Sequence, residues 1–397
     1  MSDPTTTKAM ATIALPSDFV FGEVRPATKT SAPSPAPPSL GPLASFVGAW
    51  AGSGFNTIFR PDNPETPTAP TLPIPVPTLD NILELNLTSE SLTFSPSLGS
   101  VPNRGSNSQG DIHLNGVPYL QAISDVTTGQ KIGIHVEPGL WMFVPATNAP
   151  AEGVTVVRMA SIPHGTTIEA QGISTTINGA PAIPSVDITP FITGNPGGKI
   201  PFASQTLTNS ATQRIPQDLT SFNTAGTITQ PILTDPNTVL RNVISHQTIT
   251  ATTVISVSTD PDSPLFGGGT DNIAFLQGNA TTTPDVPTPN PNAQTLQMTA
   301  TFWIETVEHT IVVPVFTPGQ SPLVIHDEEK VPGQPVTKFL VRPPFPIPVP
   351  RPITFTTTQI QYSQTVLLNF NGLTWPHVSV ATLVPADPVP VSPTSWD

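Results

Sequence analysis

Short segments in which apolar and polar residues alternate, separated by Gly, Pro and Asn, make up most of the chain from residue 41 to residue 172. A period of two places apolar side chains on one face of a β-strand, and the residues between such runs favour turns. This pattern predicts an antiparallel meander, preceded by one helical turn at 41–50. The predicted strands cover 48–55, 81–88, 91–96, 111–124, 131–145, 155–163 and 166–172.

The same alternation returns after residue 245, in segments rich in Thr, Val and Ile at 246–259, 294–316, 353–370 and 373–384. The Asn371-Gly372 step between the last two segments favours a tight hairpin, because a type I′ turn needs positive φ at both central residues. We expect about ten strands and no helix beyond one turn. The predicted fold class is all-β, an antiparallel up-and-down β-barrel whose closure removes sheet edges and encloses space for one small ligand.

Several segments lack any apolar period and divide the chain. Residues 1–38 are rich in Pro and Ser and predict a flexible arm, followed by a single domain at 39–390. Within that domain, residues 176–245 predict an irregular insertion, packed on the barrel or forming a mobile cover, since ordinary loops are shorter. Long proline-rich loops are predicted at 281–293 and 317–352.

Composition narrows the function classes. The chain of 397 residues has 52 prolines, no cysteine and a formal net charge of -13. A strongly acidic chain without basic clusters argues against nucleic acid or an anionic membrane as a partner. The absence of cysteine excludes disulfides and thiolate metal sites. With no apparent signal peptide and no apolar run of about 18 residues, we expect a cytoplasmic or otherwise intracellular protein. The oligomeric state is not specified by the sequence.

Candidate chemistry gathers in four stretches that collect the rare residue types, at 48–55, 135–141, 162–172 and 375–383. In the last stretch, strand alternation places His377 on one face with Trp375 and Ser379. One interpretation is a histidine whose ring nitrogens are satisfied by core neighbours. The other is a ligand, because neutral imidazole is the commonest protein metal ligand and one imidazole suffices to hold a heme iron.

The four stretches, in this order, resemble motifs of the nitrobindin family of heme-binding β-barrels, and the resemblance covers 41–60, 80–172 and 354–384. It implies a barrel similar to fatty-acid-binding proteins and lipocalins, one heme b, and His377 as the proximal iron ligand. The matching residues are Gly48, Trp50, Gly52 and Gly54 in the first stretch; His135, Glu137, Gly139, Leu140 and Trp141 in the second; Pro163, His164, Gly165, Glu169 and Gly172 in the third; and Tyr362, Leu373 and His377 around the last.

Further site residues follow from the resemblance. His135, Trp141 and Trp375 are candidate heme contacts, with a structural hydrogen-bonded pair between His135 and Glu137 as the alternative for the first of them. The chain also departs from the family, whose domains are less than half this length. One extra residue after His377 predicts a β-bulge there.

His164 stands where the family usually has threonine. As a functional residue it is a candidate catalytic base that takes a proton from hydrogen peroxide and returns it to the leaving oxygen, or a sixth iron ligand. The alternative is a solvent-facing residue of a hairpin turn.

The sequence thus favours a heme-binding barrel that acts on small oxidants or gaseous ligands. Peroxidase-like turnover, peroxynitrite isomerisation or scavenging, and nitric oxide binding are all consistent with the resemblance. Two other classes stay open: a heme-free carrier of an apolar molecule such as a fatty acid, and a structural or interaction protein.

Overall fold

The computed structural model describes residues 38–63, 81–209, 212–260, 267–277 and 292–396. Residues 1–37 of the predicted arm and residues 281–291 of the first predicted loop lie outside the described residues. Within it, no helix is long and apolar enough to cross a membrane.

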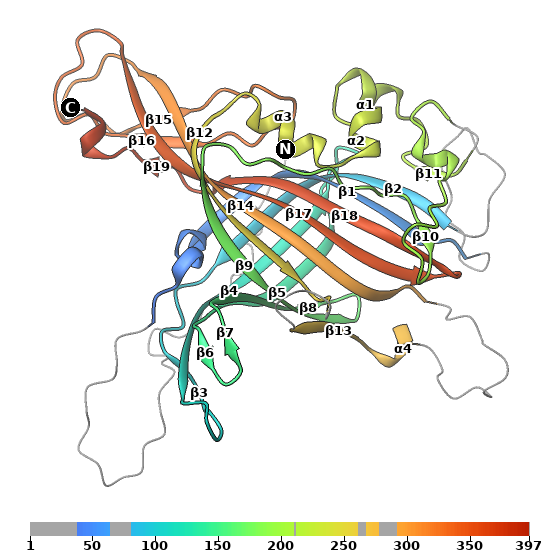
Figure 1. Ribbon diagram of the computed structural model, residues 1–397. Coiled ribbons are helices and arrows are strands. Elements are labelled where there is room, and N and C mark those ends of the chain that lie inside the picture. The colour runs from blue at the N-terminus through green and yellow to red at the C-terminus, as the bar shows by residue number, and fades with distance from the viewer. Residues whose placement is uncertain (1–37, 64–80, 210–211, 261–266, 278–291, 397) are drawn as a thin grey trace, which may run out of the picture.

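Ten antiparallel strands form a closed barrel, which confirms the predicted fold class (Figure 1). The last strand pairs with the first and closes the wall. The segments 81–88 and 91–96, predicted as separate strands, form one continuous strand. The barrel strands are β1 (Gly48–Pro61), β2 (Asn81–Phe94), β4 (Ile112–Asp125), β5 (Ile132–Val144), β8 (Thr155–Ile162), β9 (Thr166–Asn178), β12 (Thr248–Ser258), β14 (Gln294–Val313), β17 (Arg351–Phe370) and β18 (Leu373–Pro385).

Short elements decorate the barrel. The predicted turn at 41–50 is the 3-10 helix η1 (Gly41–Phe46), whereas the other short helices were not predicted. The helices are η2 (Ala203–Gln205), α1 (Thr220–Thr224), α2 (Gln230–Thr234), α3 (Thr238–Ile244), α4 (Ala274–Gln277) and η3 (Pro393–Trp396). The minor strands are β3 (Val101–Asn103), β6 (Thr147–Asn148), β7 (Ala151–Glu152), β10 (Phe191–Ile192), β11 (Arg214–Ile215), β13 (Gly268–Asn272), β15 (Leu323–His326), β16 (Lys338–Val341) and β19 (Val389–Pro390).

Two local features of the strand connections were visible in, or departed from, the predicted meander. The turn between β17 and β18 has φ of 50° at Asn371 and 74° at Gly372, as the hairpin prediction requires. The neighbour of β9 is split: β12 ends with Ser258 opposite Gln171, and β13 begins with Gly268 opposite Ala170. Along β9, strand β13 therefore continues the pairing that β12 begins.

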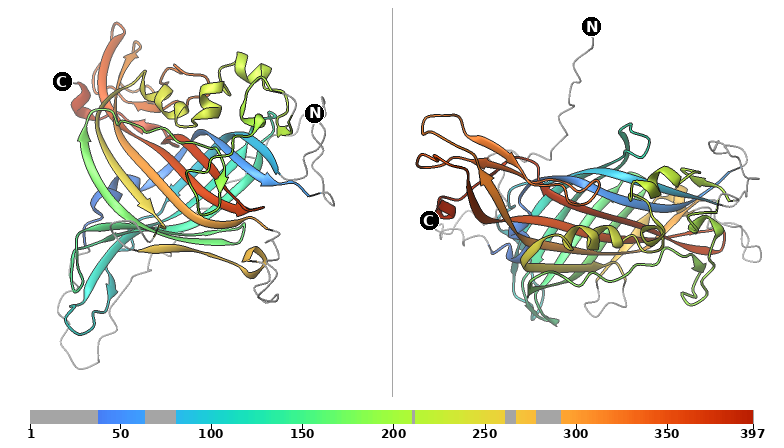
Figure 2. Two further views of the ribbon diagram at one scale, coloured as in Figure 1. Left: turned by 45° about the vertical axis from the view of Figure 1, so that its right-hand side comes forward. Right: turned by 90° about the horizontal axis from the view of Figure 1, so that it is seen from above.

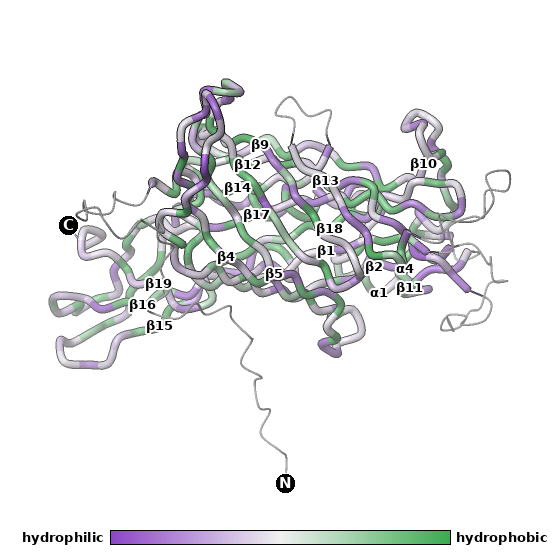
Figure 3. The backbone as a smooth tube through the Cα atoms, turned by 90° about the horizontal axis from the view of Figure 1, so that it is seen from below, coloured by the Kyte–Doolittle hydropathy of each residue, from purple (hydrophilic) through white to green (hydrophobic). Residues whose placement is uncertain are grey.

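One half of the barrel interior is packed with apolar side chains. Helix η1 closes this end, where Phe46 stacks on Phe94 with ring centroids 4.6 Å apart. Trp50 donates its indole N–H to the Phe46 carbonyl at 2.8 Å. The alternation along β14 is confirmed, because Met298 and Phe302 belong to this inner core. Figure 3 shows hydrophobic and hydrophilic residues alternating in this way along the strands.

The predicted insertion packs on the outside of the barrel. Helices α1 to α3 lie over the outer face of the wall (Figures 1 and 2). Leu233 and Leu240 from these helices share a buried apolar cluster with outward-facing residues of the wall, among them Phe55, Trp303 and Val380. The insertion is thus a packed outer layer with three short α-helices and the 3-10 helix η2, and the barrel wall is buried on both faces there.

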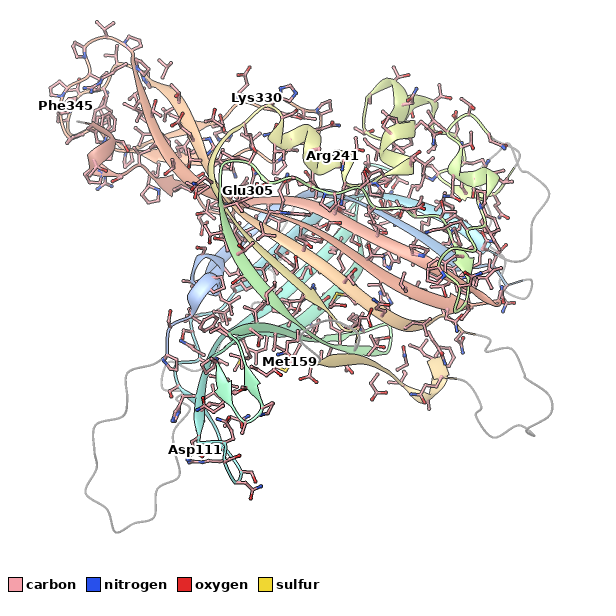
Figure 4. All side chains as sticks on the ribbon, in the orientation of Figure 1. Asp111, Met159, Arg241, Glu305, Lys330 and Phe345 are labelled. Carbon is pink, nitrogen blue, oxygen red and sulfur yellow. The ribbon has the colours of Figure 1, made fainter. Side chains whose placement is uncertain are left out.

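Strands β14 and β17 continue beyond the barrel and form, with β15, β16 and β19, a projection that we call the tip (Figure 1). The tip has its own apolar core and includes β15 and β16, which lie in the segment 317–352 predicted as a loop. Figure 4 shows Phe345 at its far end. The buried residues of this core are Ile311, Val313, Phe316, Phe339, Val341, Ile347, Ile353 and Trp396.

Candidate functional site

The other half of the barrel interior is a cavity of about 620 Å³. Its volume lies within the range of roughly 300–1,000 Å³ typical of small-molecule sites. Open clefts of about 380 and 520 Å³ lie on the outer wall, but neither is lined by a histidine. The lining of the interior cavity includes Asn56, Ile58, Arg60, Glu84, Asn86, Gln121, Ile123, Ile134, His135, Ile162, His164, Thr166, Thr295, Tyr362, Gln364, Val366, Leu368, His377 and Ser379.

The fold brings His135, His164 and His377 together around this cavity. His377 lies on β18, and His164 lies in the turn between β8 and β9. In the strand order, β8 is five steps from β18 in one direction and β9 is four steps in the other. The turn with His164 therefore faces His377 across the barrel, a relation that strand spacing in the sequence does not reveal.

His377 presents a neutral imidazole to the cavity. Burial, with smaller contributions from the charges of His135 and His164, lowers the pKa of His377 to about 3. Its Nε2 lies 2.8 Å from Nδ2 of Asn56, which also donates to Ser379 Oγ at 2.7 Å. Because an amide nitrogen only donates, Nε2 accepts this bond and carries a lone pair, and the ring proton of the neutral form is on Nδ1.

The floor of the cavity is polar and largely buried. The ring of His135 approaches Glu137, with 3.2 Å between Nε2 and Oε2. Arg158 donates to the other carboxylate oxygen at 2.6 Å, and the Tyr119 hydroxyl donates to the same oxygen. Burial alone raises the pKa of Glu137, but the Arg158 charge and the hydrogen bonds from His135 and Tyr119 outweigh it and lower the pKa to about 2. Glu137 is therefore ionised at neutral pH.

A second carboxyl group completes this floor. Tyr362 donates its hydroxyl to Glu90 at 2.6 Å, and the Gln121 side chain donates to Glu90 at 3.3 Å. Burial raises the pKa of Glu90 despite these bonds. Arg158 also donates to the cavity-lining side chain of Gln364 at 2.6 Å. This hydrogen-bonded layer separates the cavity from the apolar core behind it.

His164 lies at the rim of the cavity, exposed to solvent on one side and facing His135 on the other. The centroids of the two imidazole rings are 5.9 Å apart. Partial burial and the neighbouring His135 lower the pKa of His164, against the effect of a hydrogen bond to the Ile134 carbonyl. His164 is thus a solvent-facing turn residue that also lines the cavity.

Neither tryptophan predicted as a heme contact lines the cavity. Trp141 belongs to the packed half of the barrel, where its ring lies 5.2 Å from that of Phe302. Trp375 stacks on Phe370 at 4.6 Å and also contacts Phe59, within the apolar cluster outside the wall. The prediction that Trp375 shares a face with His377 is therefore wrong.

Strand pairing gives the physical reason for the misplaced tryptophan. Strand β18 pairs with β10 at Leu373 and Thr374 and with β1 from Val378 onward, so Trp375 lies in the gap between these two neighbours. There it turns outward to the aromatic rings beneath the insertion. The β-bulge predicted after His377 is also absent, since the register with β17 runs without a shift from Leu373 to Leu383.

Residues of β1 that line the cavity were missed at the sequence level. Trp50 points into the barrel, and a period of two from it also turns Asn56, Ile58 and Arg60 inward. Arg60 approaches Glu84 at the cavity wall, with 2.7 Å between Nε and Oε2. Alternation shows that Asn56, Ile58 and Arg60 share a face of the strand with Trp50. Which face points inward is known only once the structure places Trp50 inside the barrel.

The arrangement constrains what the cavity can bind. In the part of the chain that the structure describes, no three His, Asp or Glu side chains form a group able to hold a bare metal ion. A single neutral imidazole in an enclosed cavity, with two further imidazoles opposite, is instead compatible with a metal that brings most of its own ligands.

Comparisons with known proteins add little. No protein-family model and no curated protein matches the chain. Among solved structures, the crystal structure of Rv2717c from M. tuberculosis matches 88% of this chain and 97% of that one, with 10% sequence identity and a TM-score of 0.31. A match at this level supports no statement about function, and the fold is defined by the strand pairing described above.

Proposed function

We propose that the cavity binds one heme b through His377 and that the protein acts on small oxidants or gaseous ligands. The observation that carries the proposal is the neutral imidazole of His377 in the lining of the cavity, whose Nε2 lone pair is held by a single hydrogen bond from Asn56. A heme iron needs one such ligand from the protein.

The other lining residues fit a heme. Apolar side chains, among them Ile123, Val366 and Leu368, supply walls for a flat macrocycle. Arg60 supplies a cation suited to a carboxylate substituent, although Glu84 shares it. One contact opposes binding, because Asn56 already uses the lone pair of His377 Nε2. Iron ligation through that nitrogen requires the amide to turn away.

The chain's own residues would have three tasks in such a site. A bound heme would supply a metal centre for ligand binding and electron transfer. His377 holds that group in place. The buried polar floor that contains Glu137 keeps bulk water from entering the cavity from the side of the apolar core. His164 and His135, on the opposite wall, are placed to exchange protons at their ring nitrogens with a small ligand.

Hemin titration of the full chain, followed by its Soret absorption, tests the proposal. We expect stoichiometric uptake by the natural protein and loss of the shifted Soret band in His377→Ala. His326→Ala, which removes an exposed histidine of β15, is the matched control and should bind like the natural protein. A natural protein that takes up no hemin would overturn the proposal, and copurified lipid in that case would favour the apolar carrier.

A further inference from the structure

We propose that His135, held by Glu137, is the proton acceptor of the cavity, so that the site favours ligands that arrive as H–X. Hydrogen peroxide and hydrogen cyanide belong to this class, whereas carbon monoxide and nitric oxide carry no proton. This inference rests on the proposed heme site and selects among the ligands named for it.

The hydrogen bonding of His135 fixes the proton on one ring nitrogen. Glu137 is ionised and accepts only, so Nε2 of His135 is the donor in the 3.2 Å contact. In the neutral ring, Nδ1 then carries the lone pair. His135 lines the cavity and its side chain is 17% exposed, and no protein group among the described residues bonds to Nδ1.

The charge that proton transfer creates on His135 has a compensating partner in place. An imidazolium at this position lies against the Glu137 carboxylate, which Arg158 and Tyr119 hold from its other side. Each of these three anchoring groups is buried, so little reorganisation accompanies the transfer. Glu137 is thus a positioning residue, which acts through His135.

His164 is less suited to this role. It lies on a turn at the rim, bonded to one backbone carbonyl, and burial together with His135 disfavours its charged form. The charged and titratable groups that face His135 are Glu137 on its own strand, Glu90 from β2, His164 from the hairpin and His377 from β18. Only Glu137 bonds to the ring of His135, and it favours a positive charge there.

The proton-transfer step balances without a further reactant. A ligand H–X gives its proton to Nδ1 of His135 and keeps the electron pair of the broken bond. The products are the anion X⁻, the form that can donate a lone pair to a ferric centre, and the imidazolium of His135. When hydrogen peroxide is the ligand, Nδ1 can return the proton to the second oxygen, and a bound heme would supply the two electrons that breaking the O–O bond requires.

Cyanide association with the hemin-loaded ferric protein, measured by stopped-flow absorption at fixed pH, tests the assignment. Hydrogen cyanide must lose its proton on binding, so His135→Leu should slow association by about 10²-fold or more. Carbon monoxide binding to the ferrous protein should be unchanged in the same variant. His164→Ala should retain fast cyanide association.

Two further measurements keep the inference separable from the proposed heme site. In the heme-free protein, ¹⁵N NMR of the histidine rings should find the His135 proton on Nε2. In the hemin-loaded protein, His135→Asn should bind cyanide as slowly as His135→Leu does. Fast cyanide association in His135→Leu, or its loss in His164→Ala alone, would overturn the assignment while leaving heme binding intact. A protein that takes up no hemin overturns both proposals.

Discussion

The cavity and the tip each contain a histidine paired with a carboxylate, yet the two sites differ in what the second ring nitrogen meets. In the tip, His309 Nδ1 lies 2.7 Å from Asp327 and its Nε2 lies 2.8 Å from the Thr357 hydroxyl. In the cavity, His135 contacts Glu137 through Nε2, and its other nitrogen has no hydrogen-bond partner among the described residues.

The tip therefore reproduces the order carboxylate, imidazole, hydroxyl seen in nucleophilic catalytic sites, but its surroundings leave no room for a substrate. His309 is buried, and the rings of Phe339 and Phe355 pack on it. A chain of hydrogen bonds is thus a structural feature when every donor and acceptor is satisfied. It becomes a candidate for chemistry when one nitrogen remains available inside a cavity.

The largest expected effect comes from breaking the floor of the cavity. Arg158→Met keeps much of the side-chain volume but leaves the buried Glu137 without its cationic partner. Such a change costs ~3–5 kcal/mol of unfolding free energy. Chemical denaturation should show this loss, and it should be smaller at low pH, where Glu137 can be protonated. Equal loss at all pH values would mean that packing, and not charge, dominates.

A smaller loss is expected on the tip side of the comparison. His309→Ala removes two hydrogen bonds and the ring packed between aromatic residues, at a cost of about 3 kcal/mol. Hemin uptake should not change, because His309 is not part of the cavity lining. His326→Ala on neighbouring β15 is the control for both measurements. Impaired hemin uptake in His309→Ala would contradict the separation of the two regions.

Glu305 extends the comparison to a buried carboxyl group for which the described residues supply no cationic partner. It lies on β14 where this strand leaves the barrel for the tip (Figure 4). Burial raises its pKa to about 8, against a hydrogen bond from Gln359. The folded state thus holds the proton more tightly than the unfolded state, and the stability it contributes is complete below pH 4.5 and is lost as the pH rises towards 8.

Glu305→Gln removes this pH dependence because the amide does not ionise. We expect the variant to exceed the natural protein in unfolding free energy by several kcal/mol above the folded-state pKa, because each unit by which the pKa is raised corresponds to about 1.4 kcal/mol. The two proteins should differ little at acidic pH. The measurement is a series of urea titrations across this pH range, and parallel profiles would show that Glu305 ionises normally in the folded state.

The smallest expected effect is on hemin affinity and concerns the hydrogen bond from Asn56 to His377. Asn56→Ala removes the donor that occupies the Nε2 lone pair, and a hydrogen bond of this kind is worth about 1 kcal/mol. Hemin should therefore bind roughly fivefold more tightly to the variant. The measurement is hemin titration, with Ser379→Ala as the comparison. This second variant removes the other hydrogen-bond partner of the Asn56 amide and leaves the bond to His377 in place. Weaker binding in Asn56→Ala would show that the amide orients the imidazole.

Strand alternation and turn residues made the barrel predictable. The inward positions of β14 and the tight turn at Asn371 and Gly372 are local properties, which each segment specifies through its own side chains and φ angles. The three short α-helices of the insertion were not predictable in the same way. They are too short for stable helical periodicity, and they are stabilised by packing on the outer face of the barrel.

The candidate site divides along the same line. His377 and His164 stand out in the sequence by their rarity, but which residues share a cavity depends on strand order around the barrel. Trp375 illustrates the limit, since alternation places it beside His377 but its ring packs in the outer apolar cluster, in the gap between the pairing of β18 with β10 and with β1. The pairing of His135 with Glu137 follows from spacing, whereas the burial and the Arg158 contact that keep this carboxylate ionised come from β8.

The sequence by itself determined that this protein is a β-barrel and which of its residues are chemically unusual, because alternation and composition are properties of the linear chain. Only the tertiary structure decided that three of its histidines face one cavity while a fourth is enclosed in the tip. Burial, charge pairing and free volume arise from residues that are distant in sequence, and these three quantities separate a histidine that supports the fold from one that is available for a ligand.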